Sequence, residues 1–376
     1  MTTLKILNWN VGGAKFLELK SQKPRPYSPG MSFECREEYR FALNEALKRV
    51  LQSQGKPLVV CLQEIVQYEE SGKSDPQVRK QIFDSMDGYT YYPLPLIDTE
   101  QFGARAKWLK VMQNGGWGTD PAPFFSQGNG FLVRNDCQYF PMWCLPKRDV
   151  RNDKHPSCLN AHGGLRSGIE RVDLHPGLYF GDRNTEPRAA FVLHIVLWPE
   201  DGSVLDVFIV NLHLTTLKGE REGIPDIDEK ASEIRLNQLK LVLDNCVSPY
   251  NGWRGNDYIL RDNLSHLQDD WDIKKRYNPV WVLAGDFNFT RESAEYQYLT
   301  RRNFVDIVTP EPTKAAGLGK EPTIALDYVF AGPRYYSVNP RPSEEDLRRN
   351  RVQVYEELRV SDHYPIVATI PVVLNS

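Results

Sequence analysis

Short runs of almost unbroken apolar residues recur along the chain, separated by more polar stretches. Runs of this length and composition predict β-strands that are buried on both faces. They occupy residues 4–11, 58–64, 130–134, 189–198, 205–214, 279–286, 325–331 and 365–374. The dipeptide Asp201-Gly202 separates the fourth run from the fifth and is typical of a hairpin turn, so we expect these two strands to be joined as a hairpin.

Two other segments repeat their apolar residues with the period of an α-helix. In residues 35–52 the apolar positions fall at i, i+3, i+4, i+7 and i+8 from Leu43, which predicts a helix with one buried side. Residues 230–246 have a similar apolar side. Many strands, mixed connections and few helices predict an α/β (α+β) fold in which two packed mixed β-sheets are flanked by helices, a four-layer α/β/β/α sandwich.

Three long segments do not follow the strand pattern: 98–129, 139–188 and 248–278. They are rich in Gly, Pro, Trp, Asn and charged residues, and none is of low complexity. No period of 20–50 residues recurs, so a repeat architecture is excluded. We therefore predict a single domain over residues 1–376 that carries these segments as loop insertions, which are common places for binding residues.

Composition narrows the class of protein. Among 376 residues, 46 Lys and Arg nearly balance 49 Asp and Glu, which argues against a protein that coats nucleic acid by charge alone. None of the six cysteines forms a CxxC pair, which favours free thiols in a reducing compartment. We see no signal peptide and no run of 18 apolar residues, so we expect a cytoplasmic protein without a transmembrane segment. The oligomeric state stays open.

Polar residues of a restricted kind follow or end the predicted strands. The stretch "PVWVLAGDFNFT" leads from a buried strand to Asp286 and Asn288, which share one face of the chain because they are two residues apart. The other strand ends supply the following residues: Asn8, Asn10, Gln63, Glu64, Asn211, His213, Asp327, Ser361, Asp362 and His363. Each alone is more typical of a solvated strand end, a core histidine or a surface turn than of a functional site. Together they offer the oxygen ligands of a hard divalent cation and the proton-transfer groups that a phosphoester reaction needs.

The ordered motifs WNV, QE, NLHL, GDFN, LDYVF and SDHYP resemble those of the endonuclease/exonuclease/phosphatase superfamily. The resemblance runs from residue 8 to residue 365 with every motif in the family order. This superfamily includes pancreatic-type deoxyribonucleases, abasic-site endonucleases, inositol polyphosphate 5-phosphatases and bacterial sphingomyelinases. The resemblance is specific for the superfamily and does not select among its members.

The resemblance implies a metal site that binds Mg²⁺ or Mn²⁺. Asn10 and Glu64 are expected at the metal, with Glu64 as the principal ligand. Asp362 is expected to complete the metal shell, directly or through water. Asp286 and Asn288 are expected to hold and activate the attacking water, or to bind a second metal. The number of metal ions is left open.

The resemblance also implies the catalytic histidines. His213 is expected over the phosphate, where it protonates the leaving oxygen or stabilises the transition state. Asp327 is expected to orient His363, whose imidazole contacts the phosphate or acts as the base. The motifs do not decide whether Asp286 or His363 is the general base.

These motifs predict a divalent-metal-dependent phosphoesterase, most simply a phosphodiesterase or nuclease that acts on nucleic acid or a nucleotide diester. Asn211 and Arg166 are candidate substrate-binding residues. Gly12, at a position where many nucleases of the superfamily carry Asp or Asn, argues against an abasic-site endonuclease. The alternatives are an inositol-phosphate phosphatase, or a sphingomyelinase-like phospholipase that binds a lipid head group. A catalytically silent binding protein on the same fold is a further alternative.

Overall fold

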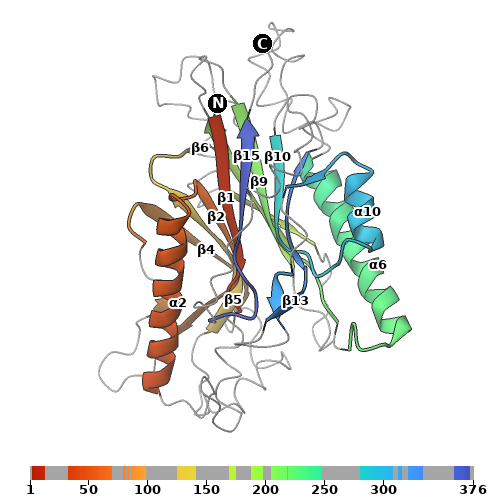
Figure 1. Ribbon diagram of the computed structural model, residues 1–376, viewed down its shortest axis with the longest axis horizontal. Coiled ribbons are helices and arrows are strands. Elements are labelled where there is room, and N and C mark those ends of the chain that lie inside the picture. The colour runs from red at the N-terminus through yellow and green to blue at the C-terminus, as the bar shows by residue number, and fades with distance from the viewer. Residues whose placement is uncertain are drawn as a thin grey trace, which may run out of the picture.

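The computed structural model describes residues 2–12, 33–69, 79–81, 83, 86–98, 125–140, 169–174, 188–197, 205–217, 219–247, 280–307, 312–315, 321–332 and 360–372. Within these residues two β-sheets face each other, and helices lie on their outer faces (Figure 1). The predicted fold class is therefore confirmed. None of the helices in the described part of the chain has the length and apolar character needed to cross a bilayer.

The first sheet has the strand order β15-β1-β2-β5-β4, with β3 paired to β2. Its strands are β1 (Thr2–Asn10), β2 (Val59–Glu69), β3 (Arg79–Gln81), β4 (Tyr89–Asp98), β5 (Phe125–Arg134) and β15 (Ile366–Val372). Helix α2 (Phe33–Ser53) connects β1 to β2, which pair in parallel, and covers the outer face of this sheet (Figure 1). The strands predicted over 4–11 and 58–64 and the helix predicted over 35–52 are thus confirmed.

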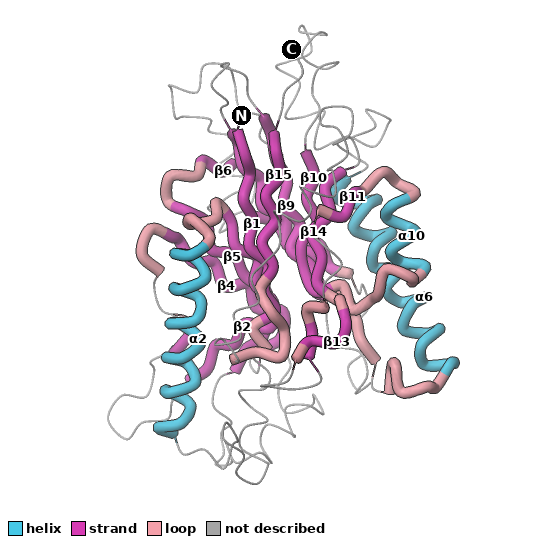
Figure 2. Tube along the Cα trace, in the orientation of Figure 1, coloured by secondary structure: helices cyan, strands magenta, loops and turns pink. Residues whose placement is uncertain are grey.

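The second sheet has the order β11-β14-β10-β9-β8-β6, with β7 paired to β8. Its strands are β6 (Gln138–Phe140), β7 (Ile169–Asp173), β8 (Ala189–Leu197), β9 (Leu205–His213), β10 (Val280–Asp286), β11 (Val305–Asp306) and β14 (Asp327–Gly332). A small separate hairpin consists of β12 (Lys314–Ala315) and β13 (Pro322–Ile324). Figure 2 shows the strands of both sheets as the central magenta layers between cyan helices.

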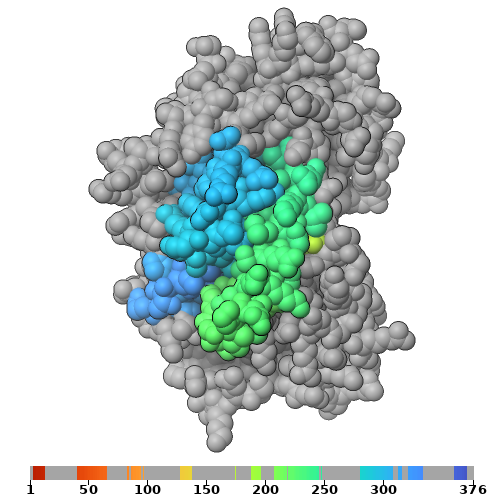
Figure 3. Space-filling model, turned by 90° about the vertical axis from the view of Figure 1, so that its right-hand side faces the viewer, coloured from red at the N-terminus to blue at the C-terminus, as the bar shows by residue number. Residues whose placement is uncertain are grey.

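Helices α6 (Pro225–Val242) and α10 (Ala294–Thr300) cover the outer face of the second sheet, and α6 continues into a π-helical turn, Leu243–Val247. Figure 3 shows α6 and α10 side by side on this face. A buried ion pair joins them, because Arg235 Nε on α6 lies 2.8 Å from Glu295 Oε1 on α10. The helix predicted over 230–246 in fact begins at Pro225, where proline is favoured because the first helical N–H needs no intrahelical partner.

Strand β10 shows why the central strands are apolar at every position. One side of β10 packs into a core formed by residues of both sheets and of α2, and it consists of Val280, Val282 and Ala284. The other side packs into a core beneath α6 and α10, and it includes Trp281 and Leu283. The strand is therefore buried on both faces, as its sequence predicts. Asp286 continues the row of Val282 and Ala284, so its carboxylate faces the first sheet where the strand ends.

Two of the three predicted loop insertions contain strands. Strand β5 begins at Phe125, inside segment 98–129, and β6 and β7 lie mostly or wholly within segment 139–188. Strand β4, which carries Pro93 and Pro95, was also not predicted. It forms the edge of its sheet, where a residue without an N–H is tolerated. Segment 248–278 lies outside the described residues, and the single-domain assignment stays a prediction.

Candidate active site

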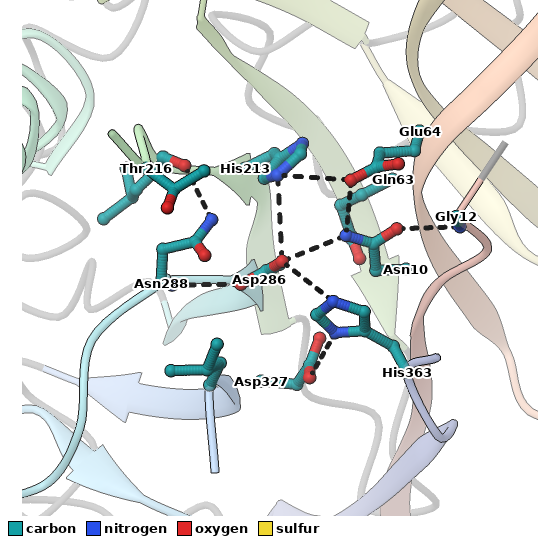
Figure 4. Close-up of polar contacts among 12 residues, drawn as sticks. Asn10, Gly12, Gln63, Glu64, His213, Thr216, Asp286, Asn288, Asp327 and His363 are labelled. Atoms are coloured by element: carbon teal, nitrogen blue, oxygen red, sulfur yellow. Dashed lines mark hydrogen bonds and ion pairs between the residues drawn. The ribbon is translucent and has the colours of Figure 1, made fainter. Parts of the chain in front are cut away.

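The register of three neighbouring strands brings His213, Asp286 and Asp327 together. Asp286 on β10 is paired with His213 on the parallel strand β9 and with Asp327 on the antiparallel strand β14. Gly285 permits this close pairing, since a Cβ atom there would lie 1.9 Å from the carbonyl oxygen of Leu212. Figure 4 shows Asp286 at the centre of the resulting cluster.

The first sheet contributes Glu64 through a β-bulge. Leu62 pairs with Gly130 and Ile65 with Gly128, so Gln63 and Glu64 together oppose the single residue Asn129. Glu64 has a φ of 56°, a left-handed conformation that costs free energy for a residue with a side chain. A bulge redirects the side chains of the strand that contains it. The Glu64 side chain therefore does not share the buried face of β2 on which Gln63 lies.

The amide of Asn10 bridges the two sheets. Its Nδ2 donates a hydrogen bond to Glu64 Oε1 at 3.2 Å and another to Asp286 Oδ2 at 3.0 Å. Its Oδ1 accepts a hydrogen bond from the backbone N–H of Gly12 at 2.9 Å. Asn10 is fully buried, so this one side chain fixes the spacing between the carboxylates that the two sheets supply.

Asn288 follows Asp286 in a second left-handed conformation, with a φ of 53°. Its backbone N–H donates to Asp286 Oδ1 at 3.0 Å, and its Nδ2 donates to the carbonyl oxygen of Leu214 at 2.9 Å. The Asn288 Oδ1 atom is buried and has no hydrogen-bond partner within the described residues. Because a buried acceptor without a donor is costly, this oxygen is suited to a water or a ligand.

His363 is backed by a carboxylate. Its Nδ1 lies 2.9 Å from Asp327 Oδ2, which also accepts a hydrogen bond from Thr313 Oγ1 at 2.6 Å. Ser361 ties the loop to β1, because its Oγ donates to the carbonyl oxygen of Asn10 at 2.8 Å. The His363 Nε2 atom lies 3.6 Å from Asp286 Oδ2, so the ring stands between the two aspartates.

His213 is backed by a cation instead. Its Nδ1 lies 2.8 Å from Arg188 Nη1, and both residues are buried. Its Nε2 lies 3.7 Å from Asp286 Oδ2 and 3.8 Å from Glu64 Oε1. Burial, reinforced by the Arg188 charge, lowers the pKa of His213 to about 3. The ring is therefore neutral near pH 7.

The two aspartates of the cluster have opposite pKa shifts. Burial alone would raise the pKa of Asp286, but the charges of His363, His213 and Lys314 and the hydrogen bond from Asn10 lower it to about 2. Burial raises the pKa of Asp327 above its usual range, against the opposing effect of the His363 charge and hydrogen bond. The cationic forms of the two histidines thus favour ionised Asp286, whereas burial favours protonated Asp327.

Asn211 lies in a buried polar layer behind the cluster. Its Nδ2 donates to the carbonyl oxygens of Leu62 at 3.1 Å and Gly130 at 2.8 Å, and its Oδ1 accepts from Gln63 Nε2 at 2.8 Å. The same Gln63 Nε2 donates to Asn8 Oδ1 at 2.9 Å. These contacts hold β9 of the second sheet against the bulge that presents Glu64.

For two of the predicted site residues, Asp362 and Arg166, the predicted role is not tested by the described contacts. Asp362 is buried next to His363, and its backbone carbonyl accepts a hydrogen bond from the N–H of Ala315 at 2.8 Å. Its position at a metal stays a prediction. Arg166 lies outside the described residues.

The sequence did not single out Arg188 or Thr313. Arg188 is the last residue of the predicted insertion 139–188 and directly precedes the apolar run that becomes β8. A lone basic residue at the start of a buried strand is the signal that was available. Thr313 has no comparable signal, since its role depends on a contact with Asp327 across the hairpin of β12 and β13.

The donor set fits a divalent cation. Carboxylate and amide oxygens are the ligands that Mg²⁺ and Mn²⁺ prefer, and here they meet at one end of both sheets. One ligand atom from each of Asp286, Asp327 and His363 lies within 4.8 Å of the others. Asp327 Oδ1, like Asn288 Oδ1, is buried without a partner within the described residues. Glu64 is less buried than the rest, with 19% of its side chain exposed, so the cluster opens toward solvent beside it.

Comparison with solved structures gives chains that align with nearly all of this one at low identity. An endonuclease/exonuclease/phosphatase from Beutenbergia cavernae DSM 12333 is 15% identical, with 99% of this chain and 72% of that chain covered and a TM-score of 0.45. The human Nocturnin catalytic domain with bound sulfate anion is 14% identical, with 98% and 92% covered and a TM-score of 0.45. D. rerio TDP2 complexed with single strand DNA product is 14% identical, with 98% and 99% covered and a TM-score of 0.42.

The family assignment rests on a sequence model instead of on any one of these structures. A comparison with curated protein sequences gave no match. The model described as "Endonuclease/Exonuclease/phosphatase family" matches residues 7–363, which include every strand end of the cluster. The chain therefore belongs to the endonuclease/exonuclease/phosphatase family.

Proposed function

We propose that this protein is a divalent-metal-dependent phosphodiesterase that acts on nucleic acid or a nucleotide diester by in-line attack of water. The family consists generally of hydrolases that act on phosphoesters and depend on divalent metal ions. The observation that carries the proposal is the set of contacts around Asp286. Its carboxylate faces two histidines, the amide of Asn10 and the backbone N–H of Asn288.

Glu64 and Asn10, together with Asp362, are the residues that would hold Mg²⁺ or Mn²⁺. When bound, such an ion supplies charge that stabilises the developing negative charge of a phosphoryl group. Asn10 positions Glu64 relative to Asp286 through its two hydrogen bonds. The Glu64 carboxylate is partly exposed, which supports entry of the phosphoester from solvent on this side of the cluster.

The attacking water is assigned to Asp286 and Asn288. The Asp286 carboxylate accepts a hydrogen bond from the water, and the unpartnered Oδ1 of Asn288 accepts a second one. The geometry favours His363 as the proton acceptor, because Asp327 at its Nδ1 leaves Nε2 as the basic atom on the Asp286 side.

The remaining residues support these roles. His213 Nε2 lies close to both carboxylates and is assigned to a phosphoryl or leaving-group oxygen. Asn211 uses its whole amide on protein groups, so we assign it to support of the bulge at Glu64 instead of substrate contact. Substrate binding by Arg166 stays a prediction.

The test is a hydrolysis screen with Mg²⁺ over single- and double-stranded DNA, RNA, thymidine 5′-phosphate p-nitrophenyl ester, inositol phosphates and sphingomyelin. We expect turnover of a nucleic acid or the nucleotide ester that stops with EDTA and returns with Mg²⁺. Glu64→Gln should lower kcat/KM by roughly 10³-fold, because several kcal/mol of charge stabilisation depends on the bound ion. Glu45→Gln on α2, which removes an exposed carboxylate, is the matched control and should leave the rate unchanged.

The screen also separates the alternatives. Turnover of inositol phosphates alone would favour the phosphatase, and turnover of sphingomyelin alone would favour the phospholipase. No hydrolysis of any substrate with either Mg²⁺ or Mn²⁺ would contradict the proposal and favour a binding protein. Full activity of Glu64→Gln would contradict the assigned site.

A further inference from the structure

The contact between Arg188 and His213 constrains the chemistry of the histidine. Arg188 lies directly before β8, and its carbonyl oxygen accepts a hydrogen bond from the N–H of Leu174 just after β7. Strand β8 pairs with β9, whose last residue is His213. Backbone pairing thus holds both residues in place, and Arg188 Nη1 lies 2.8 Å from His213 Nδ1.

A guanidinium group has N–H donors and no acceptor. A hydrogen bond from Arg188 therefore requires a lone pair on His213 Nδ1. An imidazolium ring has no such lone pair, so the ring in this contact is neutral and its one proton lies on Nε2. The state of the ring thus follows from the identity of its partner.

The proton on Nε2 faces the centre of the cluster. The Nε2 atom lies 3.7 Å from Asp286 Oδ2 and 3.8 Å from Glu64 Oε1. Both separations exceed hydrogen-bonding distance, so neither carboxylate takes up this donor. A substrate oxygen placed between these groups would receive it, since a donor fixed in advance stabilises charge that develops on an oxygen.

We propose that Arg188 is a positioning residue that holds His213 as the neutral Nε2–H tautomer, so that His213 serves the phosphoester as a hydrogen-bond donor and not as a general acid. This rests on the proposed function for its catalytic part. The assignment of the proton rests on the Arg188 contact alone. His363 has the opposite arrangement, because the Asp327 carboxylate at its Nδ1 accepts a hydrogen bond and so places a proton on Nδ1.

The experiment is two-dimensional ¹H–¹⁵N NMR of the histidine rings in metal-free protein at pH 7.5, with the His213 signals assigned by their loss in His213→Gln. In the wild type we expect His213 with a bare Nδ1 and a protonated Nε2. Arg188→Lys, which keeps a donor, should retain this pattern. Arg188→Met should lose it and show averaged or Nδ1–H signals. Arg301→Met, at the exposed end of α10, is the matched control and should leave the His213 signals unchanged.

Kinetics give the second measurement. For the substrate found in the screen, Arg188→Met should lower kcat by about 10- to 100-fold with KM changed less than about threefold, because the donor acts on charge that develops in the transition state. Arg188→Lys should recover most of this loss. If Arg188→Met does not fold, the wild-type spectrum and the Arg188→Lys variant still decide the matter.

Failures of the two proposals are distinguishable. A wild-type spectrum with Nδ1–H on His213, or unchanged signals and kcat in Arg188→Met, would overturn the role of Arg188 even if hydrolysis is observed. The expected spectrum in a protein that hydrolyses nothing would support the tautomer and contradict the proposed function.

Discussion

The two histidines of the cluster occupy nearly equivalent places around Asp286 but have opposite partners. His213 Nε2 lies 3.7 Å and His363 Nε2 lies 3.6 Å from the same carboxylate oxygen. Behind His213 is the guanidinium of Arg188, whereas behind His363 is the carboxylate of Asp327. The residue on the far side of each ring therefore determines whether its near side donates or accepts a proton.

The two rings are also mounted differently. His213 is the last residue of β9, and the paired strands β8 and β10 fix its position. His363 precedes β15 on a loop, which is held to β1 by Ser361 and by the hydrogen bond from Trp9 Nε1 to the His363 carbonyl oxygen at 2.9 Å. His213, the proposed donor, thus belongs to the second sheet. His363, the proposed base, connects the first sheet to the second.

Asp286 lies close to the Nε2 atoms of both histidines, so its replacement should lower kcat the most. Asp286→Asn removes the charge that is proposed to orient the water and adds an amide N–H₂ group that faces the donor of Asn10. We expect kcat to fall by at least roughly 10³-fold while the protein still folds. Steady-state kinetics with circular dichroism as the folding control tests this. A fall of less than about tenfold would mean that the reaction does not depend on Asp286.

His363→Gln should come next. Glutamine cannot act as a base near pH 7, so we expect a loss of about 10²- to 10⁴-fold in kcat, the usual range for general acid–base catalysis. Asp327→Asn should reproduce much of this loss, since Asp327 acts through His363. Near-normal turnover by His363→Gln would show that His363 is not the base.

His213→Gln should be much milder, because a glutamine amide also donates a hydrogen bond. We expect a loss of roughly tenfold, the value of one weakened hydrogen bond, with His213→Ala clearly worse. Measuring His213→Gln and His363→Gln on one substrate compares the two rings directly. Equal losses at the two positions would contradict their different roles.

The smallest effect concerns the pH dependence of stability in metal-free protein. The pKa of His213 is about 3 when folded and near 6.5 when unfolded, so between these values only the unfolded chain binds the proton. The free energy of unfolding should therefore decrease on acidification below pH 6.5, by up to about 1.4 kcal/mol per pH unit from this group. His213→Gln removes this contribution. Urea titrations from pH 7 to 4.5 should show the wild type losing stability more steeply than the variant, and parallel curves would contradict the buried neutral ring.

Much of the fold and part of the cluster follow from local sequence patterns. The run that ends at Asp286 is apolar because both faces of β10 are buried, and this is visible in the residues themselves. His213 and Asp286 each end such an apolar run, so their positions at strand ends are also visible in the sequence. Strand β4 is not predicted because its prolines argue against a strand. Proline is tolerated at the edge of a sheet, and which strand forms the edge is known only from the assembled sheet.

The features that the sequence does not predict depend on contacts between distant segments of the chain. The bulge that presents Glu64 arises from the register of β2 against β5, more than 60 residues away along the chain, and no residue of the QE motif encodes it. Arg188 acquires its role only when β8 pairs with β9 and brings it to His213. The type of residue at each strand end was predictable, whereas the partner behind each ring was not.

The most direct test of the proposed function follows the oxygen of the attacking water. Wild-type protein with Mg²⁺ would hydrolyse thymidine 5′-phosphate p-nitrophenyl ester in H₂¹⁸O, and mass spectrometry would locate the label. We predict one ¹⁸O atom per turnover in the phosphorus-containing product, none in p-nitrophenol, and no turnover with EDTA or in Asp286→Asn. Label in p-nitrophenol, or hydrolysis that persists in EDTA, would contradict attack of a carboxylate-held water on phosphorus beside a divalent ion.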